Sequence, residues 1–311
     1  MKGAAGLNRT DKLKELVLPG FEGIPLSSVF KFVLKGFRKG VLVTRASSIA
    51  FNLLMALLPA SIFLFTLIPF VPIPNFQQEL IKLFESIIPS GAYSFLESTI
   101  IDVITRRSGG LLIFMFIATI IFSTNGIHAL IHAFVVSAHE FQSRSWVDQR
   151  KISIVLLLIV VLMISLAGFL LIFGKMAINS LVEAHILESH LVYYLLMTLK
   201  WIVIVLLLFL AISFLYWLAP AKKSDFRFIS PGSIIATFLF ILTSLGFSAY
   251  VNNFGQYNKL YGSIGTLMVI LVWLYLNSIA LLIGFELNVS IKAANAGNFR
   301  ENEVSCNGET V

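Results

Sequence analysis

Two ionisable side chains interrupt the long apolar runs of this 311-residue chain. Glu286 is the one acidic residue that lies inside an apolar run, although the chain contains 16 Asp and Glu residues. Arg45 lies at the entrance of the first run, at a depth similar to that of Glu286. An ionisable group in an apolar environment is costly unless it is paired or hydrated, so such residues commonly mark functional sites. We predict a contact between Arg45 and Glu286, or a polar network that includes both.

Uncharged polar residues also lie near the middle of the apolar runs, and they have two interpretations. The first is a polar groove that binds a substrate between helices. The second is hydrogen bonding between helices, which contributes on average ~0.6 kcal/mol per contact in a membrane. The sequence does not favour one over the other. The residues predicted to line the groove are Arg45, Asn52, Ser123, Thr124, Asn125, His128, Asn277 and Glu286.

Sequence motifs typical of soluble enzymes are absent from the chain. His128 and His132 have the spacing of two metal ligands on one helix, but no HExxH motif surrounds them and no third ligand lies nearby. The chain contains no Walker A motif, no GxSxG and no CxxC. We therefore predict no catalytic residues, no metal site, no cofactor and no enzymatic activity.

The composition is that of a membrane protein. Hydrophobic residues make up 58% of the chain and charged residues only 13%, whereas soluble domains carry about 25% charged residues. The mean hydropathy is +0.90. Six apolar runs reach the roughly 20 residues that a helix needs to cross a bilayer. The predicted fold is an all-α polytopic bundle whose six transmembrane helices cover residues 47–71, 110–136, 152–174, 194–218, 229–250 and 264–289.

Three parts of the chain are distinguished by this pattern. Residues 1–45 form an N-terminal segment with an amphipathic helix over 26–39, residues 46–291 form the transmembrane domain, and residues 292–311 form a disordered tail. The external loop 72–109 repeats apolar residues at helical spacing, so we expect two further amphipathic helices there.

The distribution of Lys and Arg predicts the orientation. Of the 23 basic residues, 17 lie on the side of both termini and five lie on the other side. Basic residues favour the cytoplasm, so both termini are predicted to be cytoplasmic. The net charge of +7 is thereby explained by topology, and nucleic acid is not a predicted partner. The remaining basic residue, Lys200, is expected to extend to the external interface and away from Glu286.

The last third of the chain carries the most specific motifs. They are the segment 220–232 (PAKKSDFRFISPG), the segments YGSIG at 261–265 and VWLYL at 272–276, and GFELN at 284–288. Together with the opening helix from Ala46 to Pro59, this pattern resembles the YihY/virulence factor BrkB family of bacterial inner-membrane proteins over about residues 40–290. Asn125 stands where many members have a basic residue. The motif residues are Pro59, Pro231, Gly232, Tyr261, Gly262, Gly265, Trp273 and Gly284.

The resemblance implies six helices in the bacterial inner membrane with internal termini, but no settled activity. A transporter or translocase of lipid, or of a lipid-like envelope molecule, is the function we expect, with membrane lipids as partners. The alternative is a structural or accessory subunit in envelope maintenance. A homo-oligomer or an envelope protein as a further partner stays open. The label ribonuclease BN, given to some members, has no support from the residues.

Overall fold

A computed structural model of the chain describes residues 41–72, 77–78, 81, 101–102, 105–137, 145–183, 190–220, 227–253 and 257–307. Side chains are described over most of these ranges, the main exceptions being 175–191, 252–264 and 293–307. The amphipathic helix predicted for 26–39 lies outside the described residues. Most of the loop 72–109 lies outside them as well.

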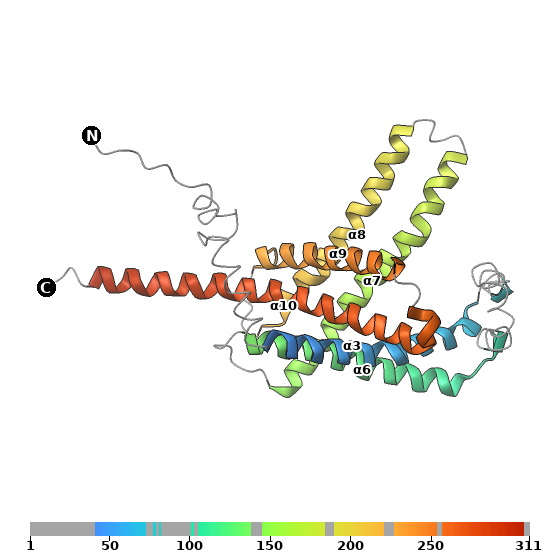
Figure 1. Ribbon diagram of the computed structural model, residues 1–311, viewed down its shortest axis with the longest axis horizontal. Coiled ribbons are helices and arrows are strands. Elements are labelled where there is room, and N and C mark those ends of the chain that lie inside the picture. The colour runs from blue at the N-terminus through green and yellow to red at the C-terminus, as the bar shows by residue number, and fades with distance from the viewer. Residues whose placement is uncertain are drawn as a thin grey trace. The chain divides into compact units, whose positions relative to one another are not determined.

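The described chain consists of helices, and none of its residues forms a β-strand (Figure 1). Six α-helices are long and apolar enough to cross a membrane, which confirms the predicted all-α bundle of six spans. A short 3₁₀ turn, η1 (Ile68–Phe70), follows the first of them. The helices are α3 (Val41–Leu67), α6 (Gly109–Ser137), α7 (Trp146–Glu183), α8 (His190–Leu218), α9 (Pro231–Asn253) and α10 (Tyr257–Asn307).

Helix ends coincide with residues that stop or cap a helix. Pro69 lies in η1, where α3 gives way to a 3₁₀ turn and an extended residue. At the start of α7, the Ser145 hydroxyl accepts a bond from the backbone N–H of Asp148 and donates to its carboxylate. The first of these bonds satisfies one of the backbone donors that a helix N-terminus leaves without an intrahelical partner.

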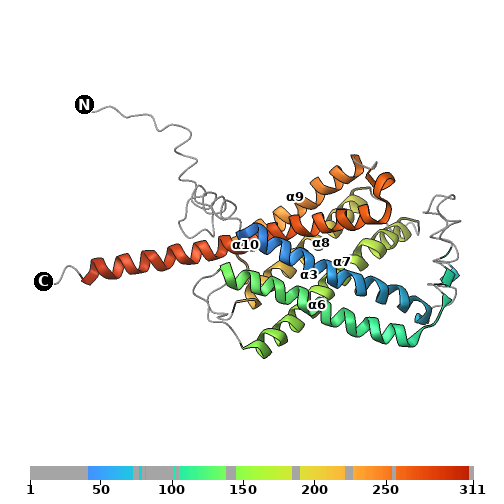
Figure 2. The same cartoon turned by 60° about the horizontal axis from the view of Figure 1, so that its bottom comes forward.

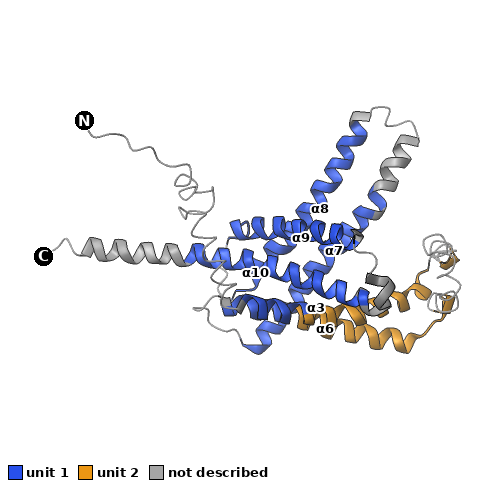
Figure 3. Cartoon of the chain, in the orientation of Figure 1, with its two compact units in different colours: residues 1–50, 127–311 blue, residues 51–126 orange. Residues whose placement is uncertain are grey.

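The chain divides into two compact units, residues 1–50 with 127–311 and residues 51–126 (Figure 3). We call these unit 1 and unit 2. Unit 1 contains α7 to α10 together with the first turns of α3 and the last turns of α6. Unit 2 contains the rest of α3 and α6 and the loop between them. Each unit is described by itself below.

In unit 2, α3 and α6 lie against each other. Gly126 approaches the backbone of Asn52 so closely that a Cβ at position 126 would lie 3.6 Å from the Asn52 carbonyl oxygen. Further along the pair, the rings of Phe63 and Phe116 have centroids 5.4 Å apart. The carbonyl of Pro69 accepts a hydrogen bond of 3.1 Å from the Arg107 side chain, which ties the loop to the end of α3.

In unit 1, α9 and α10 lie side by side, as Figures 1 and 2 both show. Helices α7 and α8 form a second neighbouring pair, and α8 also contacts α9. Helix α10 has the most buried span of the six, so it forms the centre of the core. Small side chains fill the helix contacts, as expected where helices pack closely in lipid; among the buried ones are Ala46, Ala50, Ser153, Ala211, Ala236 and Ala280.

One local feature differs from the sequence-based expectations. Helix α10 continues to Asn307, so the part of the predicted disordered tail from 292 to 307 is helical. A helix that already exists extends without a new nucleation cost, and Ala293 and Ala294 are good helix formers. Helix α3 contains Pro59 and continues past it to Leu67.

Candidate functional site

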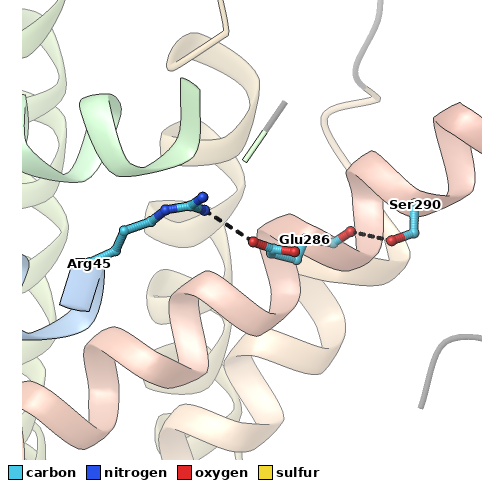
Figure 4. Close-up of polar contacts among 3 residues, drawn as sticks. All are labelled: Arg45, Glu286 and Ser290. Carbon is cyan, nitrogen blue, oxygen red and sulfur yellow. Dashed lines mark hydrogen bonds and ion pairs between the residues drawn. The ribbon is translucent and has the colours of Figure 1, made fainter. Parts of the chain in front are cut away.

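Arg45 of α3 and Glu286 of α10 form an ion pair (Figure 4). The guanidinium Nη1 donates a hydrogen bond to the Glu286 carboxylate Oε1 at 3.2 Å, and each side chain is 13% exposed. The contact that the sequence predicts between these two residues is therefore present. Both groups lie within helices that are apolar enough to cross a membrane, so the pair removes the cost of isolated charges there.

The helices hold the pair between apolar contacts. On α3, Leu42, Ala46 and Ile49 are buried, and they lie on the face of the helix that contains Arg45. On α10, Phe285 and Leu287 on either side of Glu286 are buried as well. The low exposure of both charged side chains is thus imposed by packing on each helix, and the ion pair joins two elements far apart in the sequence.

Near this pair, the backbones of α9 and α10 come into direct contact at two glycines. A Cβ added to Gly284 would lie 2.6 Å from the Ala236 Cβ and 2.7 Å from the Tyr216 hydroxyl. A Cβ added to Gly232 would overlap the carbonyl oxygen of Gly284. Real Cβ atoms do not approach other atoms so closely, so both positions require glycine. The motif residues Gly232 and Gly284 are therefore packing residues.

The amide of Asn288 completes the N-terminus of α9. Its Oδ1 accepts a hydrogen bond of 2.8 Å from the backbone N–H of Gly232, and its Nδ2 donates to the Ser230 hydroxyl at 2.9 Å. Ser230 and Ser233 bond to each other's backbone N–H groups at 3.2 Å. Pro231 fits this first turn because it lacks the N–H that would need a partner. The segment ISPG thus caps a helix against α10.

Three aromatic rings from α6, α8 and α10 meet in the same part of unit 1. Phe134 stacks on Phe285 with ring centroids 4.4 Å apart, and Tyr216 meets both rings edge-on at 5.5 and 5.6 Å. The Tyr216 hydroxyl donates a hydrogen bond of 2.6 Å to the carbonyl of Leu281. All three rings are buried. Since Phe285 directly precedes Glu286, this cluster helps to hold the acidic side chain in place.

Replacing Asn288 by alanine is expected to destabilise the protein by about 1–3 kcal/mol, because the buried N–H of Gly232 and the hydroxyl of Ser230 lose their partner. Thermal unfolding of the purified protein in detergent measures this change. Ser290→Ala is the matched control on the same helix, because the Ser290 hydroxyl bonds only back to the carbonyl of Glu286 in its own helix. Equal unfolding temperatures for both variants would contradict the capping role.

A second polar cluster joins α9 and α10 further from the ion pair. The Asn277 Oδ1 accepts hydrogen bonds from Thr243 at 3.0 Å and from Ser244 at 3.4 Å, and its Nδ2 donates to the carbonyl of Trp273 at 2.9 Å. The indole N–H of Trp273 donates to Ser244 at 3.2 Å. Asn277 is buried with its amide engaged at both ends. For this residue the structure favours hydrogen bonding between helices over a groove.

The predicted groove residues fall into both units. Arg45, His128, Asn277 and Glu286 belong to unit 1, where the ion pair brings Arg45 and Glu286 together. Asn52, Ser123, Thr124 and Asn125 belong to unit 2, where the buried Thr124 hydroxyl bonds to the carbonyl of Ile120 in its own helix. The Nδ1 atom of His128 is buried and, among the residues that the structure describes, has no hydrogen-bond partner.

No three His, Cys, Asp or Glu side chains of the described ranges are grouped so that they could hold a metal ion.

The family-motif residues Pro59 and Gly265 are buried, and Trp273 belongs to the Asn277 cluster. Tyr261 and Gly262 lie on α10, in a stretch whose side chains are outside the described residues.

Lys200 lies far from the ion pair. Its ammonium group lies 5.4 Å from the ring centroid of Trp201, and its aliphatic chain packs on Gly174 of α7, where a Cβ would lie 3.0 Å away. The distance along α8 from Lys200 to Tyr216 is about 24 Å at roughly 1.5 Å per residue. Tyr216 in turn bonds to Leu281, close to Glu286. Lys200 and Glu286 therefore do not pair, as the topology predicts.

Sequence reasoning missed Tyr216 and Asn288 as site-forming residues. Asn288 could have been found, because it follows Gly284 by one helical turn and so lies on the same face of α10. Tyr216 has no such signal. A tyrosine near the end of an apolar run is typical of a membrane interface, whereas this one is buried in the core.

Comparisons with known proteins identify the same family as the sequence motifs of the last third of the chain. The family model described as "Virulence factor BrkB" matches residues 33–305. The "Putative ribonuclease-like protein YfkH" of Bacillus subtilis is 33% identical over 245 residues, which are 79% of this chain and 88% of that protein. A UPF0761 membrane protein of Coxiella burnetii is 24% identical over 259 residues, 81% of this chain and 89% of the relative.

A UPF0761 membrane protein of Pseudoalteromonas translucida is more similar over a shorter stretch, 37% identical over 90 residues, 29% of this chain and 30% of the relative. No solved structure matches the chain significantly. The family model spans most of the chain, including the residues of the ion pair and of the glycine contact. The chain is a multi-pass integral membrane protein that belongs to the BrkB family.

Proposed function

We propose that this protein moves lipid, or a lipid-like envelope molecule, across the bacterial inner membrane, with both termini in the cytoplasm. The observation that carries the proposal is the Arg45–Glu286 pair, in which two charged side chains lie within apolar helices at 13% exposure. Ionisable groups at such positions commonly mark a substrate pathway. The partial exposure of both groups leaves a polar headgroup able to reach them.

The charge distribution supports the orientation that this proposal assumes. The ion pair lies near the first turn of the α3 span and the last turns of the α10 span, and the basic termini flank these ends. By the distribution of Lys and Arg this is the cytoplasmic side. The pair would then meet lipid from the inner leaflet first. The sequence contains no ATP-binding motif, so movement would follow a gradient, a partner protein or the lipid's own concentration difference.

Reconstitution into liposomes tests the proposal. Lipids with a fluorophore on an acyl chain are placed in both leaflets, and dithionite bleaches the fluorophores of the outer leaflet. Lipid movement by the protein is expected to carry the bleached fraction from about one half towards completion, which protein-free liposomes do not show. A bleached fraction equal to that of protein-free liposomes, for zwitterionic and anionic lipids alike, would contradict the proposal.

A structural or accessory subunit is the second candidate, and a specific observation favours it. The Asn277 cluster and the glycine contact show α9 and α10 packed tightly and with their polar groups bonded to each other. We infer that these two helices form a fixed scaffold, as expected of a subunit that holds its partners and moves no substrate. The two candidates differ in whether the ion pair has a role beyond folding, and a double substitution of the pair separates them, as described in the Discussion.

The third class, an enzyme, is the one we favour least. The printed name of the Bacillus subtilis relative describes that protein as ribonuclease-like. In this chain, Glu286 is the one acidic residue inside the apolar runs, and its carboxylate forms an ion pair with Arg45. Metal-assisted cleavage of RNA commonly uses several clustered carboxylates. We therefore propose a role without catalysis.

A further inference from the structure

The position of the Arg45–Glu286 pair sets the part of a lipid that could reach it. The α10 span Leu267–Lys292 has 26 residues, or about 39 Å at roughly 1.5 Å per residue, which exceeds the ~30 Å hydrocarbon core. Glu286 lies about 9 Å from the Lys292 end of this span. The pair therefore lies a few ångströms inside the boundary of the hydrocarbon core, within reach of a headgroup that moves slightly inward.

The pair as a whole is electrically neutral, so it does not attract an anion by net charge. A headgroup that enters between the two side chains must replace the partner of each. A phosphate matches the guanidinium of Arg45, since planar guanidinium groups bind phosphate oxygens through paired N–H donors. An ammonium group matches the carboxylate of Glu286. A headgroup that carries both charges leaves the site neutral, whereas an anionic one leaves Glu286 without a counter-charge at a low-exposure position.

We propose that Arg45 and Glu286 form a headgroup site that selects zwitterionic lipids carrying a phosphate and an ammonium group. This inference rests on the proposed movement of lipid and names the class of lipid moved. Specificity is a difference between two affinities, and here the difference comes from the charge that the wrong lipid leaves uncompensated. The preference for the zwitterionic lipid over an anionic one is expected to be about tenfold or more.

The experiment uses the full chain in liposomes of phosphatidylethanolamine and phosphatidylglycerol. Two tracers, one of each headgroup, carry the fluorophore on an acyl chain so that the headgroup stays intact. The measured quantity is the ratio of the initial rates of the two tracers, phosphatidylethanolamine over phosphatidylglycerol. Both tracers compete with the same host lipids, so the ratio reports selectivity rather than the overall activity of each preparation.

The ratio is expected to be about ten or more for the unmodified protein. In Glu286→Gln the ratio is expected to fall to one or below, because the ammonium loses its carboxylate while Arg45 still binds phosphate. Glu286→Asp, which keeps a carboxylate, is expected to restore part of the preference. The matched control is Lys151→Gln, which removes a basic group whose side chain is 72% exposed and is expected to leave the ratio unchanged.

Three results would overturn the inference, and they are distinguishable from failure of the proposed function. Equal rates for both tracers in the unmodified protein, a preference for the anionic tracer, or an unchanged ratio in Glu286→Gln would each do so while lipid movement itself stands. The absence of movement for either tracer would reject the proposed function and the inference with it. The ratio of the unmodified protein tests the inference even where a variant does not fold.

Discussion

Replacing Gly284 by valine is expected to abolish the folded protein. Its Cβ would lie 2.6 Å from that of Ala236 and 2.7 Å from the Tyr216 hydroxyl, and the two further methyl groups add to this overlap. Overpacked cores typically lose about 1–3 kcal/mol of stability. The loss in Gly284→Val is expected to exceed about 3 kcal/mol, because the backbones of α9 and α10 cannot separate without breaking the Asn288 cap. The fraction of purified protein that elutes as a single species from size-exclusion chromatography in detergent measures the effect.

The matched control lies on α9 itself. Nothing lies within 4 Å of a Cβ added to Gly246, so Gly246→Val is expected to elute as the unmodified protein does. A glycine-to-alanine change at an open helix position even stabilises by up to about 1 kcal/mol. If Gly284→Val and Gly246→Val behaved alike, the close approach of α9 and α10 would not be essential to the fold.

The six spans could be predicted because apolar length alone determines them. The structure places their ends within a few residues of those expected from the sequence, for example 231–251 against 229–250 for the fifth. The main departure is at the C-terminal end of α10, which continues to Asn307 and not only to 289. Helix α7, with 38 residues, also exceeds what a bilayer requires. Hydropathy records where a helix becomes polar, whereas the helix itself continues until its backbone is stopped by a turn or a cap.

The ion pair could be predicted for a related reason. Orientation followed from the distribution of Lys and Arg, and the position of each residue within its span then gave its depth. This reasoning predicts Arg45 and Glu286 at similar depth on one side of the membrane and Lys200 on the opposite side. Depth is therefore readable from one sequence. The rotation of a helix about its axis is much harder to read when most of its sides are apolar.

The groove shows this limit. Asn277 has the depth expected of a groove residue, but its amide faces Thr243 and Ser244 of the neighbouring helix. Which neighbour a polar residue faces depends on the packing of α9 against α10. That packing is set by glycines at 232 and 284, whose role is visible only once the two backbones are seen in contact. The same holds for Tyr216, whose hydroxyl reaches a carbonyl of α10.

Replacing both members of the ion pair by apolar residues is expected to separate folding from function. Glu286→Gln alone leaves Arg45 without its counter-charge, so it is expected to cost about 3 kcal/mol while the protein stays folded. The double variant Arg45→Met with Glu286→Leu removes both charges and keeps similar volume. Buried ion pairs replaced in this way commonly keep or gain stability, so the unfolding temperature is expected to return to that of the unmodified protein or above.

Lipid movement is expected to be lost in that double variant, because both charged groups of the pair, which would bind a headgroup, are then gone. Two measurements are made on the same preparation, the unfolding temperature in detergent and dithionite bleaching in liposomes. If the pair is functional, the unfolding temperature equals or exceeds that of the unmodified protein, while the bleached fraction equals that of protein-free liposomes. A double variant that is stable and moves lipid at the unmodified rate would show that the pair serves only to hold α3 against α10. In that case Arg45 and Glu286 would leave the site, and the structural subunit would become the better account of this protein.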